Sequence, residues 1–250
     1  MGARENQEDS YGIIYDGVLT QEGFPTCFIL ADGMGGHKGG AIASQIAIDS
    51  IKIQLSELEN LDPLFLAGMV ETANQEIAKF LELHPTSSGM GTTLIVALIK
   101  NGRLYWASVG DSALFLARDK KDLVRVNDDH SMRPVLEKMI EAGLQSSNDY
   151  DALKNKKNML RSALMGSNLE LVDTNSEGIP LEPDDSVILC SDGFETLEDL
   201  EIYSLVQSST FSNLSDKCLA LTEALESAKN PKQDNSTLIL IDAAHYLNPQ

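Results

Sequence analysis

Short apolar runs bounded by turn residues recur along the chain and predict β-strands. These runs cover residues 10–15, 26–31, 92–99, 104–109, 113–117, 123–126, 186–190 and 236–241. Asn101-Gly102 separates two of the runs, and this dipeptide readily adopts the positive φ angles of a tight hairpin turn. The pattern therefore predicts antiparallel strands joined as meanders.

Four other stretches repeat apolar residues every three or four positions, which predicts amphipathic helices. They cover residues 41–55, 63–83, 132–142 and 213–228. Helix pairs alternate with antiparallel meanders, and the pattern lacks the strand–helix–strand rhythm of a parallel sheet. We therefore expect an α+β layered fold. No repeat or linker divides the 250 residues, so one domain over residues 1–250 is expected.

The chain is strongly acidic, with 19 Lys and Arg against 38 Asp and Glu and a net charge of -19. Nucleic acids and anionic membranes are bound through Lys and Arg, so neither is expected as a partner. A charged, solvated surface is the ordinary explanation of such acidity. The alternative is that some of the carboxylates converge on a cation.

The cysteines Cys27, Cys190 and Cys218 are odd in number and widely spaced. This pattern is typical of free thiols in a reducing compartment, and it does not resemble a disulfide framework or a zinc site. The longest strongly apolar run, residues 94–99, is far too short to span a bilayer. Residues 1–15 contain no apolar core of a signal peptide. A cytoplasmic protein without membrane insertion is expected.

Acidic residues stand at the ends of several predicted strands. The pairs concerned are Glu8-Asp9, Asp32-Gly33, Asp192-Gly193 and Asp234-Asn235. A single Asp-Gly pair is usually a turn, but an aspartate at the mouth of a buried strand is held in a fixed direction. Several such carboxylates repel one another unless a cation neutralises them. Ligation by oxygen alone favours Mg²⁺ or Mn²⁺ over Zn²⁺, so the sequence favours a site for such ions.

Five glycines between Gly33 and Gly40 raise the alternative of a loop that binds nucleotide phosphates. The segment lacks the Gly-Lys-Ser/Thr ending of a P-loop. Lys38 stands where the last glycine of G-x-G-x-x-G would be. A nucleotide-binding loop is therefore disfavoured.

Eight sequence blocks resemble, in the same order, the metal-dependent serine/threonine protein phosphatases of the PPM (type 2C) family in their bacterial form. The blocks are RENQED (4–9), ADGMGGHKGG (31–40), GTTLIVALI (91–99), ASVGDS (107–112), DDHS (128–131), LRSALMG (160–166), LCSDGF (189–194) and DNSTLILI (234–241). The resemblance covers almost the whole chain. It implies a four-layer α-β-β-α sandwich, with two central antiparallel β-sheets flanked by helices and a metal site in a cleft at one end.

The resemblance also implies a set of ligands for two Mg²⁺ or Mn²⁺ ions. Asp32 would bridge both ions, and the Gly33 carbonyl and Glu8 would complete one site. Asp192 and Asp234 would hold the other ion. Two neighbouring cations lower the pKa of a bridging water and offset the charge of the phosphoryl oxygens.

Other motif positions carry further roles by resemblance. Asp9 would orient metal-bound water, and Arg4 would bind the substrate phosphate through its planar guanidinium. Asp129 would form a third, weaker metal site together with Asp192. Asp111 and Asn235 fall in motif positions whose expected role is supporting or structural.

The chain departs from the family pattern at several positions. Ala113 replaces a commonly basic residue, and Thr196 stands where a second aspartate is frequent, which weakens the expectation of a third ion. His37 has two possible roles, a structural hydrogen-bond donor or a general acid, and the first is favoured. His130 is expected to be structural. The polar segment within residues 131–158 corresponds to the family's variable flap, which contributes to substrate choice.

The resemblance implies an enzyme that hydrolyses phosphoserine and phosphothreonine by attack of a metal-bridging water or hydroxide. Its expected partners are phosphoserine and phosphothreonine proteins, among them a bacterial Ser/Thr kinase and the kinase's substrates. A monomer is expected. One alternative is an inactive relative that binds phosphoproteins, which the complete set of carboxylates disfavours. A phosphatase for small phosphate esters is the other alternative, and the sequence leaves it open.

Overall fold

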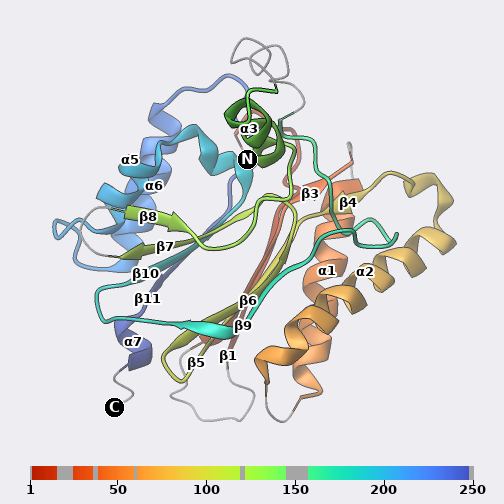
Figure 1. Ribbon diagram of the computed structural model, residues 1–250, viewed down its shortest axis with the longest axis horizontal. Coiled ribbons are helices and arrows are strands. Elements are labelled where there is room, and N and C mark those ends of the chain that lie inside the picture. Colours follow the sequence, from red (N-terminus) through yellow and green to blue (C-terminus); the bar gives the residue numbers. More distant parts are fainter. Residues whose placement is uncertain are drawn as a thin grey trace.

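Two antiparallel sheets, stacked face to face, form the centre of the computed structural model. The structure describes residues 2–15, 25–35, 39–58, 61–118, 122–144 and 157–247. One sheet has the strand order β1-β2-β5-β6-β9, the second has the order β11-β10-β7-β8, and β3 and β4 form a short pair. Helices α1 and α2 lie on the outer side of the first sheet, and α5 and α6 lie on the outer side of the second (Figure 1). The expected four-layer α-β-β-α sandwich is confirmed.

The five-stranded sheet contains the predicted hairpin. Its strands are β1 (Ser10–Tyr15), β2 (Pro25–Ala31), β5 (Leu94–Lys100), β6 (Arg103–Val109) and β9 (Asp173–Pro180). Asn101 and Gly102 join β5 to β6 with φ angles of 51° and 68°, the positive values that a tight hairpin turn requires. Strand β9 was not predicted, because it is an edge strand with mainly polar residues.

The remaining strands lie close to predicted positions, except β3, which was not predicted. They are β3 (Gly33–Met34), β4 (Gly91–Thr92), β7 (Ala113–Arg118), β8 (Asp122–Arg125), β10 (Ser186–Cys190) and β11 (Leu238–Asp242). The predicted strand 92–99 is divided in two. Thr92 pairs with Gly33 in the short sheet, whereas β5 begins two residues later.

All four predicted helices are present. The α-helices are α1 (Gly39–Ser56), α2 (Leu66–Leu83), α3 (Arg133–Glu141), α5 (Asp199–Val206), α6 (Leu214–Ser227) and α7 (Ala244–Leu247). The 3-10 helices are η1 (Pro63–Phe65), η2 (Pro85–Ser87) and η3 (Asp192–Thr196). The predicted helix 63–83 thus begins as η1 and continues as α2. Short α5 was not predicted. None of the described helices is long and apolar enough to cross a membrane.

Each interface between layers has its own apolar core. Adjacent residues of β2 show the arrangement: Ile29 packs in the cluster under α1 and α2, and Leu30 packs in the cluster between the sheets. A third cluster joins β10 to α5 and α6. Because both faces of the sheets are covered, the central strands are apolar at successive positions and do not alternate with polar residues. Cys27 and Cys190 are buried in these strands as free thiols, and Cys218 is a free thiol on α6.

Candidate active site

The antiparallel register brings the predicted acidic residues to one end of the sandwich. Ser10 pairs with Ala31, so the residues before β1 lie beside those after β2. Cys190 pairs with Leu238, so the residues after β10 lie beside those before β11. A cleft of about 600 Å³ opens at this end. Of the predicted site residues, its lining includes Arg4, Glu8, Asp32, Gly33, Asp192 and Asp234.

The backbone of Asp32 is held between β2 and β3. Its amide donates to Thr93 Oγ1 (3.0 Å), and its carbonyl accepts from the Thr93 amide and from Thr92 Oγ1, both at 2.9 Å. Gly33 follows where the chain passes close to its neighbours. A Cβ at Gly33 would lie 2.3 Å from the carbonyl oxygen of Gly40, so only glycine fits.

Asn235 connects the two distant ends of the site. Its Oδ1 accepts from the Glu8 amide (2.8 Å), and its Nδ2 donates to the Asn6 carbonyl (3.0 Å). Ser44 on α1 donates to the Glu8 carbonyl at 2.6 Å. These bonds fix the backbone on which Glu8 is carried, which is the supporting role expected of Asn235.

Asp9 is buried beneath the cleft. Its Oδ2 accepts from Ser191 Oγ (2.9 Å) and from Thr237 Oγ1 (2.7 Å). Its Oδ1 is also buried and receives no hydrogen bond from the described residues. Burial raises the pKa of Asp9, although the two hydroxyl donors oppose this. A buried carboxylate oxygen without a donor is costly, and a nearby cation offsets that cost.

Burial and then mutual repulsion raise the pKa values of three carboxylates at the cleft. Burial and then repulsion from Asp192 raise the pKa of Asp32 well above its usual range. Burial and repulsion from Asp234 raise the pKa of Asp192 to about 6. Burial and repulsion from Asp192 raise the pKa of Asp111 to about 7. Such groups are ionised together at neutral pH only beside positive charge, and their oxygens suit Mg²⁺ or Mn²⁺. The residues therefore fit the expected ions.

Arg4 supplies positive charge at the edge of the cleft. Its Nη2 forms an ion pair with Asp234 Oδ2, and the preceding amide, that of Ala3, donates to the Gln233 carbonyl at 2.7 Å. In this arrangement no three acidic, histidine or cysteine side chains of the described ranges are placed to hold an ion together. An ion coordinated by Asp234 would have to compete with the ion pair to Arg4.

Comparison with known proteins agrees with this geometry. A family model described as protein phosphatase 2C matches residues 6–230. The chain belongs to the protein phosphatase 2C family. It is 29% identical over 246 residues to the serine/threonine phosphatase stp of Listeria innocua, covering 96% of this chain and 91% of that protein.

Solved structures of the phosphatase 2C family share the fold. A crystal structure of the Mycobacterium tuberculosis serine/threonine phosphatase PstP/Ppp matches with a TM-score of 0.75 and 27% identity, covering 95% of this chain and 92% of that one. A catalytic domain of PstP in complex with two manganese ions matches with a TM-score of 0.72 and 25% identity, with the same coverage.

Asp129, the predicted ligand of a third ion, and Asp111 have different surroundings. The Asp129 carboxylate lies 3.5 Å from Arg125 Nη1 and accepts from the Ser131 amide at 2.7 Å. Asp111 lines the cleft near Asp192. Sequence analysis had not proposed Asp111 as a ligand. The sequence offered one indication that Asp111 belongs to the site: it stands just after β6, as Asp32 and Asp192 stand just after strands.

Further predicted residues can be located. Thr196 Oγ1 donates to Gln233 Oε1 (2.9 Å), so it ties η3 to the loop before β11. His130 is structural, as expected: its buried Nδ1 accepts from the Gly110 amide at 3.2 Å. His37 and residues 145–156 of the flap lie outside the described residues.

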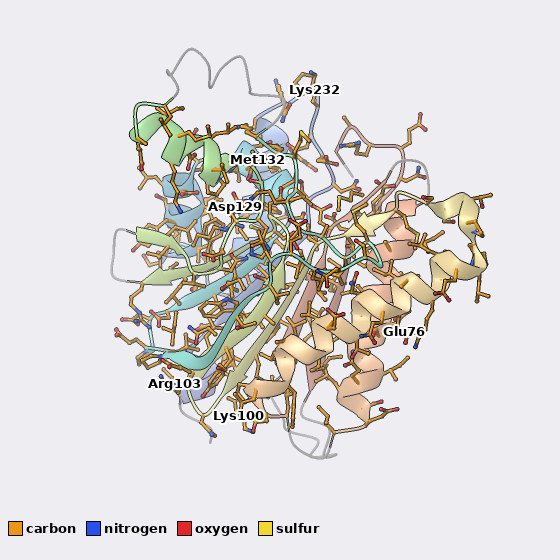
Figure 2. The ribbon with its side chains drawn as sticks, turned by 45° about the vertical axis from the view of Figure 1, so that its right-hand side comes forward. Glu76, Lys100, Arg103, Asp129, Met132 and Lys232 are labelled. Atoms are coloured by element: carbon orange, nitrogen blue, oxygen red, sulfur yellow. The ribbon has the colours of Figure 1, made fainter. Side chains whose placement is uncertain are left out.

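Asp129, Met132 and Lys232 lie toward the cleft end, far from Lys100 and Arg103 beside the hairpin turn (Figure 2).

Proposed function

We propose that the chain is a metal-dependent phosphatase that hydrolyses phosphoserine and phosphothreonine in proteins. One observation carries the proposal: partly buried carboxylates from segments far apart in the sequence converge beside an arginine in a single cleft. The mutual rise of their pKa values supports a requirement for cations. The serine/threonine phosphatases among the relatives, and the PstP domain with two manganese ions, support the same reaction.

The residues at the cleft divide into ion ligands and a phosphate-binding group. We propose that Asp32, the Gly33 carbonyl and Glu8 hold one Mg²⁺ or Mn²⁺ ion, and that Asp32, Asp192 and Asp234 hold the second. When bound, the two ions offset phosphoryl charge and supply hydroxide near neutral pH. The remaining groups are the protein's own contribution to binding and orientation.

Asp9 and Arg4 act beside the ligands. Asp9 is fixed beneath the cleft by Ser191 and Thr237, from where it would orient water bound at the ions. Arg4 would release Asp234 and then bind the substrate phosphate through two parallel N–H donors. A third, weaker ion would be held by Asp192. Asp111 suits that ion better than Asp129, which is paired with Arg125.

The wider proposal concerns the whole chain. We propose that residues 1–250 form one catalytic domain that acts as a monomer in the cytoplasm on proteins phosphorylated by a Ser/Thr kinase. Arg4 and Glu8 meet Asp234 and Asn235 at the cleft, which supports one domain whose site is formed within a single copy. Three free thiols support a reducing compartment.

Phosphatase assays test the proposal directly. A phosphothreonine peptide and p-nitrophenyl phosphate are assayed with Mn²⁺ and with chelator. We expect metal-dependent turnover of both compounds, and we expect Asp32→Asn to abolish it while circular dichroism stays native. Asp184→Asn, at an exposed position between β9 and β10, is the matched control and should remain active. Absence of turnover would show an inactive phosphoprotein-binding relative, and turnover of the ester alone would exclude protein substrates.

A further inference from the structure

One wall of the cleft is lined with methionine side chains. Met34 on β3 and Met159 and Met165 in the segment after α3 line the same cleft as Asp32 and Asp192. Met159 is 56% exposed and Met165 is 40% exposed, so both side chains are open to solvent. We call Met34, Met159 and Met165 the methionine wall.

Met34 and Met165 lie next to one another, and Met159 is held by the backbone beside α3. A Cβ built on Gly91 would lie 2.8 Å from Met165 Cγ and 3.1 Å from Met34 Cε, so both side chains pack against the same point of β4. The Met159 carbonyl accepts from the Met132 amide at 2.9 Å. The absence of a side chain at Gly91 leaves room for the two thioethers.

The segment that carries the wall is anchored on both sides of Met165. Leu164 and Thr92 exchange backbone hydrogen bonds of 2.9 and 3.0 Å. Asn74 on α2 accepts from the Gly166 amide at 2.8 Å. The exposed methionines therefore belong to a surface that is held in place before any ligand binds, which lowers the entropic cost of binding.

The charges of the cleft do not favour an acidic neighbour of the phosphorylated residue. Arg4 is paired with Asp234, and Arg161 Nε donates to the Ser131 carbonyl at 3.0 Å. Among the described lining residues these are the only cations, and Glu170 adds a carboxylate beside the wall. The rest of the described lining is therefore apolar, acidic or neutral and polar, the last including Asn158, Ser162, Ser167 and Asn168.

We propose that the methionine wall binds an apolar side chain of the substrate, located within a few residues of the phosphorylated serine or threonine. The inference rests on the proposed function, because a phosphorylated residue bound at Arg4 must lead its flanking chain through the same cleft. The cleft of about 600 Å³ is larger than a phosphorylated side chain needs. Methionine is unbranched and polarizable, so the wall accepts leucine, isoleucine or phenylalanine of different shapes.

Phosphothreonine peptides with a single varied position test the inference. Leucine, glutamine or aspartate is placed in turn at three positions on each side of the phosphothreonine, and kcat/KM is measured with Mn²⁺. We expect leucine to be preferred over glutamine about tenfold at one or more positions, the discrimination typical of an apolar pocket. Aspartate should be the poorest. In the double variant with Met159→Gln and Met165→Gln, the ratio of kcat/KM for the leucine and glutamine peptides should fall to about one.

Two controls separate recognition from damage to the fold. Met159→Leu combined with Met165→Leu restores an apolar wall and should recover the leucine preference. Leu219→Gln removes an apolar residue of α6 that is 58% exposed and lies outside the cleft, and it should keep the full preference. Because each preference is a ratio within one protein, a general loss of activity does not affect it.

The outcomes distinguish this inference from the proposed function. Equal turnover of the leucine and glutamine peptides by the wild-type protein, or a preference that persists in the double glutamine variant, would overturn the inference. Preference for aspartate would overturn it as well. Failure of the wild-type protein to hydrolyse any phosphopeptide with Mn²⁺ would instead overturn the proposed function.

Discussion

Replacing Asp192 with asparagine should stabilise the metal-free protein at neutral pH. Burial, followed by repulsion from Asp234, raises the pKa of Asp192 from 3.8 to about 6. A carboxyl whose pKa is higher in the folded protein than in the unfolded chain destabilises the fold once it is ionised. At about 1.4 kcal/mol per pKa unit, the penalty above pH 7 is about 3 kcal/mol, and the neutral amide removes it with little change in shape.

Thermal unfolding followed by circular dichroism measures the effect. In chelator at pH 7.5, the Tm of Asp192→Asn should exceed that of the wild-type protein by about 6 to 12 °C, the range for a chain of this length. The penalty is absent below about pH 4 and develops as the pH rises through about 6, so the two proteins should converge at pH 4. With excess Mn²⁺ the wild-type protein should have the higher Tm, because only the wild-type protein retains the complete ligand set.

The control is Asp184→Asn, which removes an exposed carboxylate away from the cleft. Its unfolding free energy should stay within about 0.5 kcal/mol of the wild-type value. If Asp192→Asn unfolds below the wild-type protein in chelator at pH 7.5, the carboxylates do not repel one another in the metal-free protein. The electrostatic argument for cations at this cleft would then fail.

Three further changes test the contacts around the cleft. Arg4→Ala should raise KM for a phosphopeptide about tenfold. Arg4→Lys should recover only part of the lost affinity, because an ammonium lacks the planar fork of a guanidinium. An unchanged steady-state KM in both variants would contradict the assignment of Arg4 to phosphate binding. Asn235→Ala removes the hydrogen bonds to Glu8 and Asn6. The free energy of unfolding, measured by urea denaturation, should fall by about 1 to 3 kcal/mol. Calorimetry should show weaker Mn²⁺ binding. Gly193→Ala would place a Cβ 1.9 Å from the Asn235 carbonyl oxygen, so it should abolish activity or folding; a native melting curve with full activity would refute that geometry.

Elements with a strong pattern of their own were predictable from the sequence. Strand β10 has buried apolar residues throughout and lies where its pattern placed it. Helix α2 repeats buried residues on one side, so it was also recognised. Strand β9 is an edge strand with polar residues, and pairing with β6 determines its structure. Its residues give no local signal of that pairing.

The candidate site was predictable as a list of acidic residues, but its arrangement was not. Asp111 and Asp129 have similar surroundings in the sequence, since both follow predicted strands. Only the packed structure shows that Asp129 lies beside Arg125 and that Asp111 faces Asp192. The role of Gln233 was likewise hidden, because its partners Gly193 and Thr196 are about forty residues earlier in the chain.

The bonds between the two ends of the chain have a consequence for protein synthesis. Arg4 and Ala3 reach Asp234 and Gln233, which leave the ribosome long after them. Strands β1, β2, β5 and β6 and helices α1 and α2 emerge much earlier and contain their own apolar core. Domains fold as their residues emerge during synthesis. The first layers therefore leave the ribosome well before the cleft can form, and this domain cannot dephosphorylate anything until Gln233 and Asp234 have been made.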